Sequence, residues 1–213
     1  MSDVPKVMAP FSGRPFLDLL IEYLKSQHIE RIVLCTGYKA DMVEDHYRTN
    51  DFGITIDFSR ENEPLGTGGA LANTRDIVLS DPFFVLNGDS FLPADLQAFF
   101  NFHKDKKCLA SILVTQVKNG KDFGNLVLDA NSRIINFKEK KEEGGKCFVN
   151  AGVYCFNQEI FSCMPDKKVF SIETDLFPSL LGDRFCGYRI DKEFMDIGTP
   201  ARYEAAKQRL KKG

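Results

Sequence analysis

Apolar residues in the first half of the chain recur with two different periods. Phe16, Leu19, Leu20, Tyr23 and Leu24 follow the i, i+3, i+4 spacing of an amphipathic helix. Short apolar runs and alternating segments between polar residues indicate strands. In order, the pattern predicts a helix over 15–27, a strand over 32–35, a helix over 39–47, a strand over 54–58, a doubly buried strand over 83–86 and a helix over 93–103. The glycine-rich segment 66–69 is expected to interrupt the chain before another helical stretch.

The second half has a different pattern, with more strands and fewer helices between them. The turn from Asp129 to Arg133 is suited to closing a hairpin. Thr199 is suited to capping a final helix that has Pro200 in its first turn. The predicted elements are strands over 110–117, 124–128, 134–138 and 148–156, a helix over 172–181 and a strand over 185–190. Strands joined by helices predict one α/β domain over 1–213, with a parallel sheet covered on both faces.

Composition narrows the classes of partner. The chain has 213 residues, 43% hydrophobic and 27% charged, and a formal net charge of −2. Such a balance is that of a folded globular domain, and it provides no basic field for a nucleic acid or a membrane surface. No apolar stretch approaches the ~18 residues of a membrane span, and the N-terminal residues do not resemble a signal peptide. We therefore expect a cytoplasmic protein.

The six cysteines are scattered, and none forms a C-x-x-C pair or has a histidine at zinc-ligand spacing. We expect them to be reduced and mostly structural. Cys35, at the end of an apolar run, is expected to behave as a small buried hydrophobe.

Three loops are the candidates for chemistry, because ligands of open α/β sheets bind at the carboxyl ends of the strands. They are 61–70, 87–89 and 196–199, and they bring Asp89 and Asp196 to one rim. Two carboxylates suit Mg²⁺, which fills its other positions with phosphate oxygens and water. The alternative for each aspartate is a turn former or helix cap, and glycines permit any tight turn. Lysines such as Lys6 and Lys140 are by default solvated.

The order of short motifs resembles that of the sugar-1-phosphate nucleotidyltransferases, and it does so over nearly the whole chain. The branch that makes GDP-activated D-glycero-D-manno-heptose is most similar, with mannose-1-phosphate guanylyltransferases as near relatives. The motifs are Pro5-Lys-Val-Met-Ala-Pro10, Arg14-Pro-Phe-Leu17, Gly37-Tyr-Lys39, Glu63-Pro-Leu-Gly-Thr-Gly-Gly-Ala70, Leu86-Asn-Gly-Asp89, Phe137-Lys-Glu-Lys140, Asn150-Ala-Gly-Val-Tyr154 and Asp196-Ile-Gly-Thr-Pro200.

The resemblance implies a three-layer α/β/α Rossmann-like fold with a mixed, mostly parallel sheet, and it implies transfer of GMP from GTP to a heptose or mannose 1-phosphate. The product class is a nucleotide sugar for lipopolysaccharide, capsule or S-layer precursors. Asp89 and Asp196 would be the Mg²⁺ ligands, and Lys6 would neutralise triphosphate oxygens. Lys140 would hold the sugar phosphate.

The remaining roles implied by the resemblance concern the nucleoside and the sugar. A homo-oligomer is compatible with this assignment. Glu63 is our hypothesis for base selection, because a carboxylate can accept from the N1–H and 2-amino donors of guanine; an exposed loop acid is the equal alternative. The nucleoside would be received by Glu63, Leu65, Gly66, Thr67, Gly68 and Gly88, and the sugar would face Glu139, Asn150 and Gly152.

The sequence departs from the family at its start. Members normally have a first strand and a G-G-x-G-T-R phosphate loop upstream of the motif at Pro5 and Lys6, whereas this sequence begins at Met1. We expect the printed start to be an internal methionine of a longer reading frame, so that the fold would lack its first strand as printed. One alternative is a fragment that acts as a sugar-phosphate-binding or interaction module. Another is a GT-A-like glycosyltransferase, although the motif ending in Asp89 supplies only one carboxylate of an Asp-x-Asp site.

Overall fold

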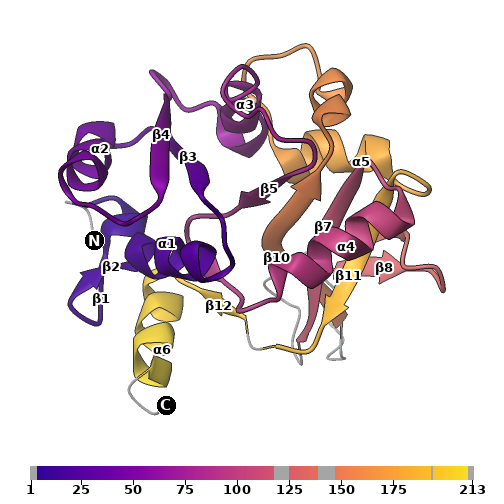
Figure 1. The fold of residues 1–213 in the computed structure, drawn as a ribbon. Coiled ribbons are helices and arrows are strands. Elements are labelled where there is room, and N and C mark those ends of the chain that lie inside the picture. The colour runs from indigo at the N-terminus through magenta and orange to yellow at the C-terminus, as the bar shows by residue number, and fades with distance from the viewer. Residues whose placement is uncertain (1–3, 118–124, 139–146, 193, 211–213) are drawn as a thin grey trace.

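Helices cover both faces of a central sheet in the computed structural model of the chain (Figure 1). The structure describes residues 4–117, 125–138, 147–192 and 194–210. Helices α1 (Phe16–Ser26) and α4 (Leu96–Lys106) pack on one face, and α3 (Gly66–Ala72) and α5 (Phe177–Leu180) pack on the other. The predicted three-layer α/β/α class is confirmed.

The remaining predicted helices and strands occur in the predicted order, and six short elements that were not predicted, η1, β1, β2, β6, η2 and β12, lie before or between them. None of the helices in the described ranges is long and apolar enough to span a lipid bilayer. The bounds are η1 (Lys6–Met8), β1 (Pro10–Phe11), β2 (Arg14–Pro15), β3 (Arg31–Thr36), α2 (Ala40–Thr49), β4 (Thr55–Arg60), β5 (Phe83–Leu86), β6 (Ser90–Phe91), β7 (Ala110–Val117), β8 (Asn125–Leu128), β9 (Ile134–Lys138), β10 (Cys147–Phe156), η2 (Gln158–Cys163), the π-helical turn η3 (Ile172–Leu176), β11 (Phe185–Ile190), β12 (Met195–Asp196) and α6 (Pro200–Leu210).

The largest sheet is mixed, and β10 lies at its centre. β10 pairs antiparallel with β5, β7 and β8, so these three strands run in one direction. β11 adds to β7 in parallel, and β9 closes a hairpin on β8. The Asp129 N–H donates to the carbonyl of Arg133 at 2.9 Å, which confirms the predicted hairpin turn. β3 and β4 form a separate parallel pair.

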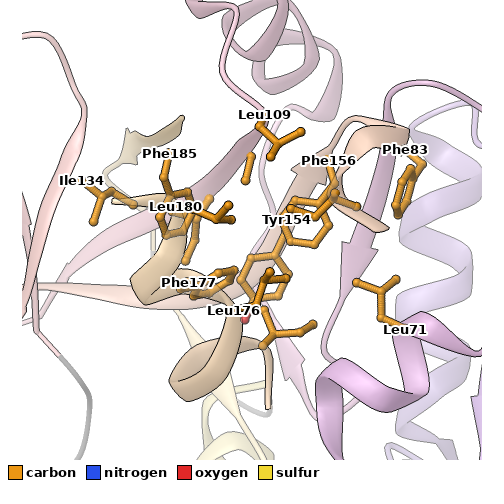
Figure 2. Close-up of a cluster of buried hydrophobic side chains, with 14 of the residues drawn as sticks. Leu71, Phe83, Leu109, Ile134, Tyr154, Phe156, Leu176, Phe177, Leu180 and Phe185 are labelled. Atoms are coloured by element: carbon orange, nitrogen blue, oxygen red, sulfur yellow. The ribbon is translucent and has the colours of Figure 1, made fainter. Parts of the chain in front are cut away.

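Alternation along the central strands produces two cores. Ile112 and Val114 of β7 and Tyr154 of β10 face α3, α5 and η3 in one apolar cluster, which Figure 2 shows. Leu113 and Val153, one position along the same strands, face α1 and α4 on the opposite side. Since side chains of a strand point alternately to its two faces, buried residues in succession require a sheet covered on both sides.

A cavity of ≈ 1090 Å³ lies between β3 and β5. Both strands line it along their whole length, and α1 contributes apolar side chains such as Leu20 and Ile21. Among the described residues, β3 pairs only with β4 and β5 only with β10, so each strand turns an unpaired edge to the cavity. This corrects two expectations. The strand 83–86 was expected to be buried on both faces, but only Phe83 of β5 is buried. Cys35, near the end of β3, was expected to be buried, but it is exposed. Both differences arise because the two strands border open space.

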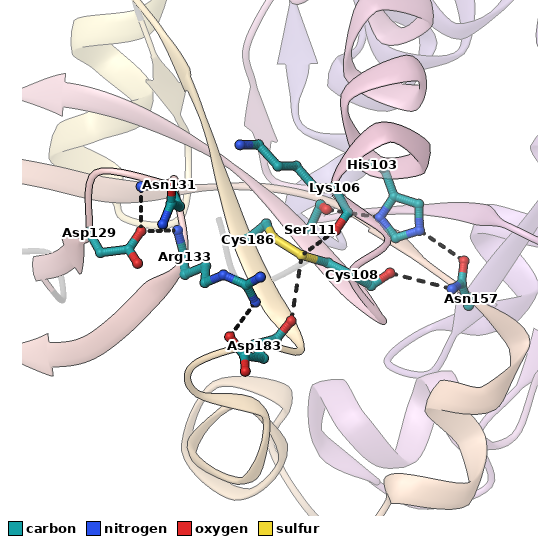
Figure 3. Close-up of a disulfide and its surroundings, with 10 residues drawn as sticks. All are labelled: His103, Lys106, Cys108, Ser111, Asp129, Asn131, Arg133, Asn157, Asp183 and Cys186. Atoms are coloured by element: carbon teal, nitrogen blue, oxygen red, sulfur yellow. Dashed lines mark hydrogen bonds and ion pairs between the residues drawn. A yellow bond between two sulfur atoms is a disulfide. The ribbon is translucent and has the colours of Figure 1, made fainter.

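Two other expectations are corrected. The glycine-rich segment does not interrupt the chain before a helix, because α3 itself begins at Gly66. Cys108 and Cys186 form a disulfide and are therefore not reduced (Figure 3). Cys108 lies between the end of α4 and the start of β7, and Cys186 lies on β11. Because β11 runs beside β7, the α-carbons of the two cysteines lie 6.2 Å apart. The spacing of the two cysteines along the sequence gives no sign of this neighbourhood.

Candidate active site

Two short antiparallel strands bring the predicted metal ligands together. The pairing of β6 with β12 sets Asp196 opposite Ser90, and the Ile197 N–H donates to the carbonyl of Asp89 at 2.9 Å. A β-carbon on Gly198 would lie 3.0 Å from Asp196 Oδ1 and 3.4 Å from Asp89 Oδ2. The two carboxylates therefore face one small space, as predicted from their positions after two strands.

The two carboxylates lie among charges of both signs. Burial, and then repulsion from Asp196, raise the pKa of Asp89, whereas Lys6 opposes the shift. Arg202 Nη1 donates to Asp196 Oδ2 at 2.9 Å. Two facing carboxylates in a half-buried space provide the hard oxygen donors that Mg²⁺ takes, with its other positions left for phosphate oxygens and water. Among the described residues, no group of three or more histidine, cysteine, aspartate or glutamate side chains is arranged to hold a metal ion.

Lys6 belongs to the same group of charges. Its exposed side chain extends from η1, and Nζ donates to the carbonyl of Gly198 at 3.0 Å. An ammonium here lies beside the carboxylates and remains accessible to an anionic ligand. The structure thus brings Lys6, Asp89 and Asp196 together although they come from both ends of the chain.

The predicted nucleoside residues divide into two sets. Gly66, Thr67 and Gly88 line the cavity together with Asp89. Leu65 is buried at the start of α3, and its carbonyl accepts from the N–H of Phe170 at 3.0 Å. Leu65 and Gly68 therefore pack on the side of the segment away from the cavity. Gly66, Thr67 and Gly88 are accessible to a ligand in the cavity.

Packing against Phe170 explains why glycine occupies positions 66 and 68. Gly66 has φ +73°, and a β-carbon there would lie 2.6 Å from the carbonyl oxygen of Phe170. A β-carbon on Gly68 would lie 2.3 Å from the Phe170 ring. The N–H groups of Gly68 and Gly69 both donate to the carbonyl of Phe170. These glycines permit close approach of another chain segment, and two of their N–H groups are already used by it.

Glu63 lies outside the cavity wall. Its exposed carboxylate forms an ion pair with Lys168, and the hydrogen bond from Lys168 lowers the pKa of Glu63. A base-reading role would require this carboxylate to exchange Lys168 for guanine. Glu61, from the same loop, lines the cavity, and its Oε2 accepts from the N–H of Leu65 at 3.0 Å.

The predicted sugar residues of β10 form a turn inside the strand. The register between β10 and β7 shifts between Asn150 and Tyr154, and Gly152 in between has φ +69°. The Gly152 N–H donates to Asn150 Oδ1 at 2.7 Å, and the Asn87 N–H donates to the Gly152 carbonyl at 2.8 Å. A β-carbon on Gly152 would lie 2.7 Å from Ser90 Oγ. The bulge therefore joins the sugar residues to the segment that carries Asp89.

Beside the bulge lies a buried hydrogen-bond network that the sequence did not predict. Glu139 and Lys140 lie outside the described residues. Tyr154 is fully buried, and Asn150 Nδ2 donates to its hydroxyl at 2.8 Å. The Tyr154 hydroxyl in turn donates to Glu173 Oε1 at 3.3 Å. Sequence reasoning placed Glu173 on a helix and assigned it no role, because neither its spacing nor a motif marks it.

Known proteins are similar to this chain over nearly its whole length. The family model described as "Nucleotidyl transferase" matches residues 2–213. A D-glycero-alpha-D-manno-heptose 1-phosphate guanylyltransferase of Aneurinibacillus thermoaerophilus is 37% identical over 99% of this chain and 91% of its own length. A Campylobacter jejuni protein of the same name is 35% identical over 95% of this chain and 89% of its own.

A solved structure agrees with these sequence relatives. HddC from Yersinia pseudotuberculosis, crystallised with GMP-PN, superposes with a TM-score of 0.87 at 33% identity, over 98% of this chain and 91% of that one.

Proposed function

Because this chain belongs to the nucleotidyl transferase family, we propose that it transfers GMP from GTP to a heptose or mannose type of sugar 1-phosphate. The observation that carries the proposal is the convergence of Lys6, Asp89 and Asp196 on one edge of a cavity that also reaches the Gly66 loop. Sequence relatives with 35–37% identity bear the names of heptose 1-phosphate guanylyltransferases, which supports the choice of substrates.

The reaction needs little acid or base catalysis by side chains. A phosphate oxygen of the sugar 1-phosphate, already anionic near neutral pH, attacks the α-phosphorus of GTP. One P–O bond forms there, the bond to the β-phosphate oxygen breaks, and pyrophosphate leaves with the electron pair. The chief obstacle is the approach of two anions, so the chain must supply positioned positive charge.

The described residues suit that task. Asp89 and Asp196 would hold Mg²⁺, which neutralises phosphate charge when it is bound. Lys6 lies beside the two aspartates and would contact triphosphate oxygens. Asn150 and Gly152 would present the sugar from the β10 bulge, and Lys140 and Glu139 are proposed to complete the sugar site.

Pyrophosphate release tests the proposal directly. The chain is assayed with Mg²⁺, four nucleoside triphosphates, and heptose and mannose 1-phosphates. We expect turnover with GTP, and we expect Asp89→Asn or Asp196→Asn to lower kcat by about 100-fold or more, since each removes charge that binds the metal. Asp105→Asn, which changes an exposed aspartate on α4, is the matched control and should retain parental activity. Full activity of either site variant would refute the metal assignment.

A further inference from the structure

Glu173 is half-buried on η3, where hydrogen bonds from two directions meet at its carboxylate. Thr67 Oγ1, from the predicted nucleoside loop, donates to Glu173 Oε2 at 2.9 Å. Tyr154, from beneath the predicted sugar pocket, donates to Glu173 Oε1 at 3.3 Å. The two donors lie on different elements: Thr67 is on α3 and is a predicted nucleoside residue, and Tyr154 is on β10 and contacts the predicted sugar residue Asn150.

The directions of these hydrogen bonds are fixed. The Thr67 hydroxyl accepts from the Ile172 N–H at 2.9 Å, so its own proton is free to donate to Glu173. The Ser171 hydroxyl accepts from two backbone N–H groups and donates to Glu173 Oε2 at 2.8 Å. Burial, and then the charge of Glu173, raise the pKa of Tyr154, so its hydroxyl stays protonated and donates. Three hydroxyl groups therefore donate to the two oxygens of one carboxyl group.

The sugar side of this network determines how Asn150 is oriented. Because the Tyr154 hydroxyl donates to Glu173, its lone pairs accept from Asn150 Nδ2 at 2.8 Å. Asn150 Oδ1 then accepts from the Gly152 N–H at 2.7 Å. The buried Tyr154 and the Gly152 N–H thereby fix the side-chain amide of Asn150 in one orientation.

On these contacts we propose that Glu173 is a positioning residue that couples the nucleoside loop to the sugar pocket. Its carboxylate holds Thr67 with one oxygen and, through Tyr154, orients Asn150 with the other. The inference depends on the proposed function, because it takes the roles of Thr67 and Asn150 from that assignment. It predicts that one substitution at Glu173 disturbs the binding of both substrates.

Glu173→Gln is the direct test, because glutamine keeps the shape and replaces one acceptor oxygen with a donor. The new amide then faces either Tyr154 or the pair Thr67 and Ser171, donor against donor, so the side chain must leave its position between the two sets of donors. We expect kcat/KM for GTP and for the sugar 1-phosphate each to fall by about tenfold or more, the usual effect of losing a hydrogen bond to a charged group. Tyr154→Phe should raise the KM for the sugar 1-phosphate more than that for GTP, and Thr67→Val should do the reverse.

Asp175→Asn is the matched control, because Asp175 is a second carboxylate on the same turn. It accepts from the Ser171 N–H and pairs with Lys167, so its loss loosens η3 without removing a bond to Thr67 or Tyr154. We expect this variant to lower the Tm and to leave kcat/KM for both substrates within about twofold of the parent.

The outcomes separate the two proposals. If the parent releases no pyrophosphate with any substrate pair, the proposed function is wrong and this inference is overturned with it. If the parent is active and Glu173→Gln changes neither kcat/KM, or changes them only as much as Asp175→Asn does, the inference alone is overturned. The inference is supported if Glu173→Gln lowers kcat/KM for both substrates, Tyr154→Phe raises mainly the KM for the sugar 1-phosphate, and Thr67→Val raises mainly the KM for GTP.

Discussion

Gly152 occupies a position where both the backbone conformation and the available space exclude a side chain. Its φ of +69° lies in the left-handed region. A β-carbon would also lie 2.7 Å from Ser90 Oγ and 2.8 Å from Asn87 Nδ2. Gly182 has a similar φ of +90°, but a β-carbon there would meet no atom within 4 Å. The two glycines therefore separate backbone strain from steric conflict.

Substitution of each glycine by alanine measures the two effects. Gly182→Ala should lower the free energy of unfolding by about 1 kcal/mol, the usual cost of a left-handed alanine. Gly152→Ala should cost a further ~1–3 kcal/mol, because Ser90 and Asn87 must move. It should also raise the KM for the sugar 1-phosphate. Urea unfolding of both variants provides the comparison, and equal destabilisation would show that the bulge yields without conflict.

At the residue scale, the sequence predicted the aspartates better than the glycines. Asp89 follows β5 and Asp196 ends the short strand β12, and the rule that ligands bind at strand ends was enough to place them together. Gly66 and Gly68 were assigned to a ligand, whereas much of their close packing is against Phe170. That partner lies a hundred positions further along the chain, and no local pattern identifies it.

At the element scale, a buried histidine holds α4 on the sheet (Figure 3). His103 Nδ1 lies 2.8 Å from Ser111 Oγ of β7, and Nε2 lies 2.9 Å from Asn157 Oδ1 just after β10. Only 1% of the His103 surface is exposed. Burial lowers the pKa of His103 below its usual 6.5, because the charged imidazolium is disfavoured in an enclosed site.

Folding stability should therefore fall in mild acid. Below about pH 6.5 the unfolded chain protonates His103 while the folded chain does not, until the pH reaches the lower folded pKa. This residue adds a slope of up to about 1.4 kcal/mol per pH unit in that window, with stability rising as the pH rises.

Urea unfolding at pH 7.5 and pH 5.5 measures this difference. His103→Gln should be less stable than the parent at pH 7.5, and it should lose less stability between the two pH values. His28→Asn changes an exposed histidine with a left-handed backbone and should keep the parental slope. An unchanged slope in His103→Gln would assign the acid sensitivity to other groups.

Periodicity predicted most elements but not how they assemble. Helix α1 matches its predicted range closely because its apolar residues follow the helical period, and β7 and β11 match theirs because each begins with a short continuous buried run. Helix α4 begins at Leu96, three residues later than predicted, because Asp95 caps it by accepting from the N–H of Ala98 at 2.9 Å. The central position of β10 and the short β6–β12 pair depend on long-range pairing, which periodicity does not contain.

At the scale of the whole molecule, the two halves of the sheet meet across the cavity between β3 and β5. Apolar side chains of α1 line one side of it, so the layers continue across the gap while the backbone pairing does not. The predicted nucleoside and metal residues Gly66, Gly88 and Asp89 lie on the same cavity. The candidate site therefore borders the same cavity as the unpaired edges of β3 and β5.

The register of β3 shows which of its backbone groups face the cavity. The carbonyl of Glu30 accepts from the N–H of Thr55 in β4 at 2.9 Å, and the carbonyl of Thr36 accepts from the N–H of Glu61 just after β4 at 2.7 Å. Because the N–H and C=O of one strand residue point to the same side, even-numbered residues of β3 face β4. The N–H groups of Val33 and Cys35 consequently face the cavity, where the described chain offers no strand to accept them.

Hydrogen exchange resolved by residue tests this arrangement within a single strand. We expect the amides of Val33 and Cys35 to exchange roughly tenfold or more faster than that of Leu34, because only the latter is paired to β4. Leu113 of β7, which has a strand on each side, should be the best protected reference. Equal protection of Val33, Cys35 and Leu34 would mean that the edge is paired in solution. Dependence of that protection on protein concentration would then identify a second copy of the chain as the partner.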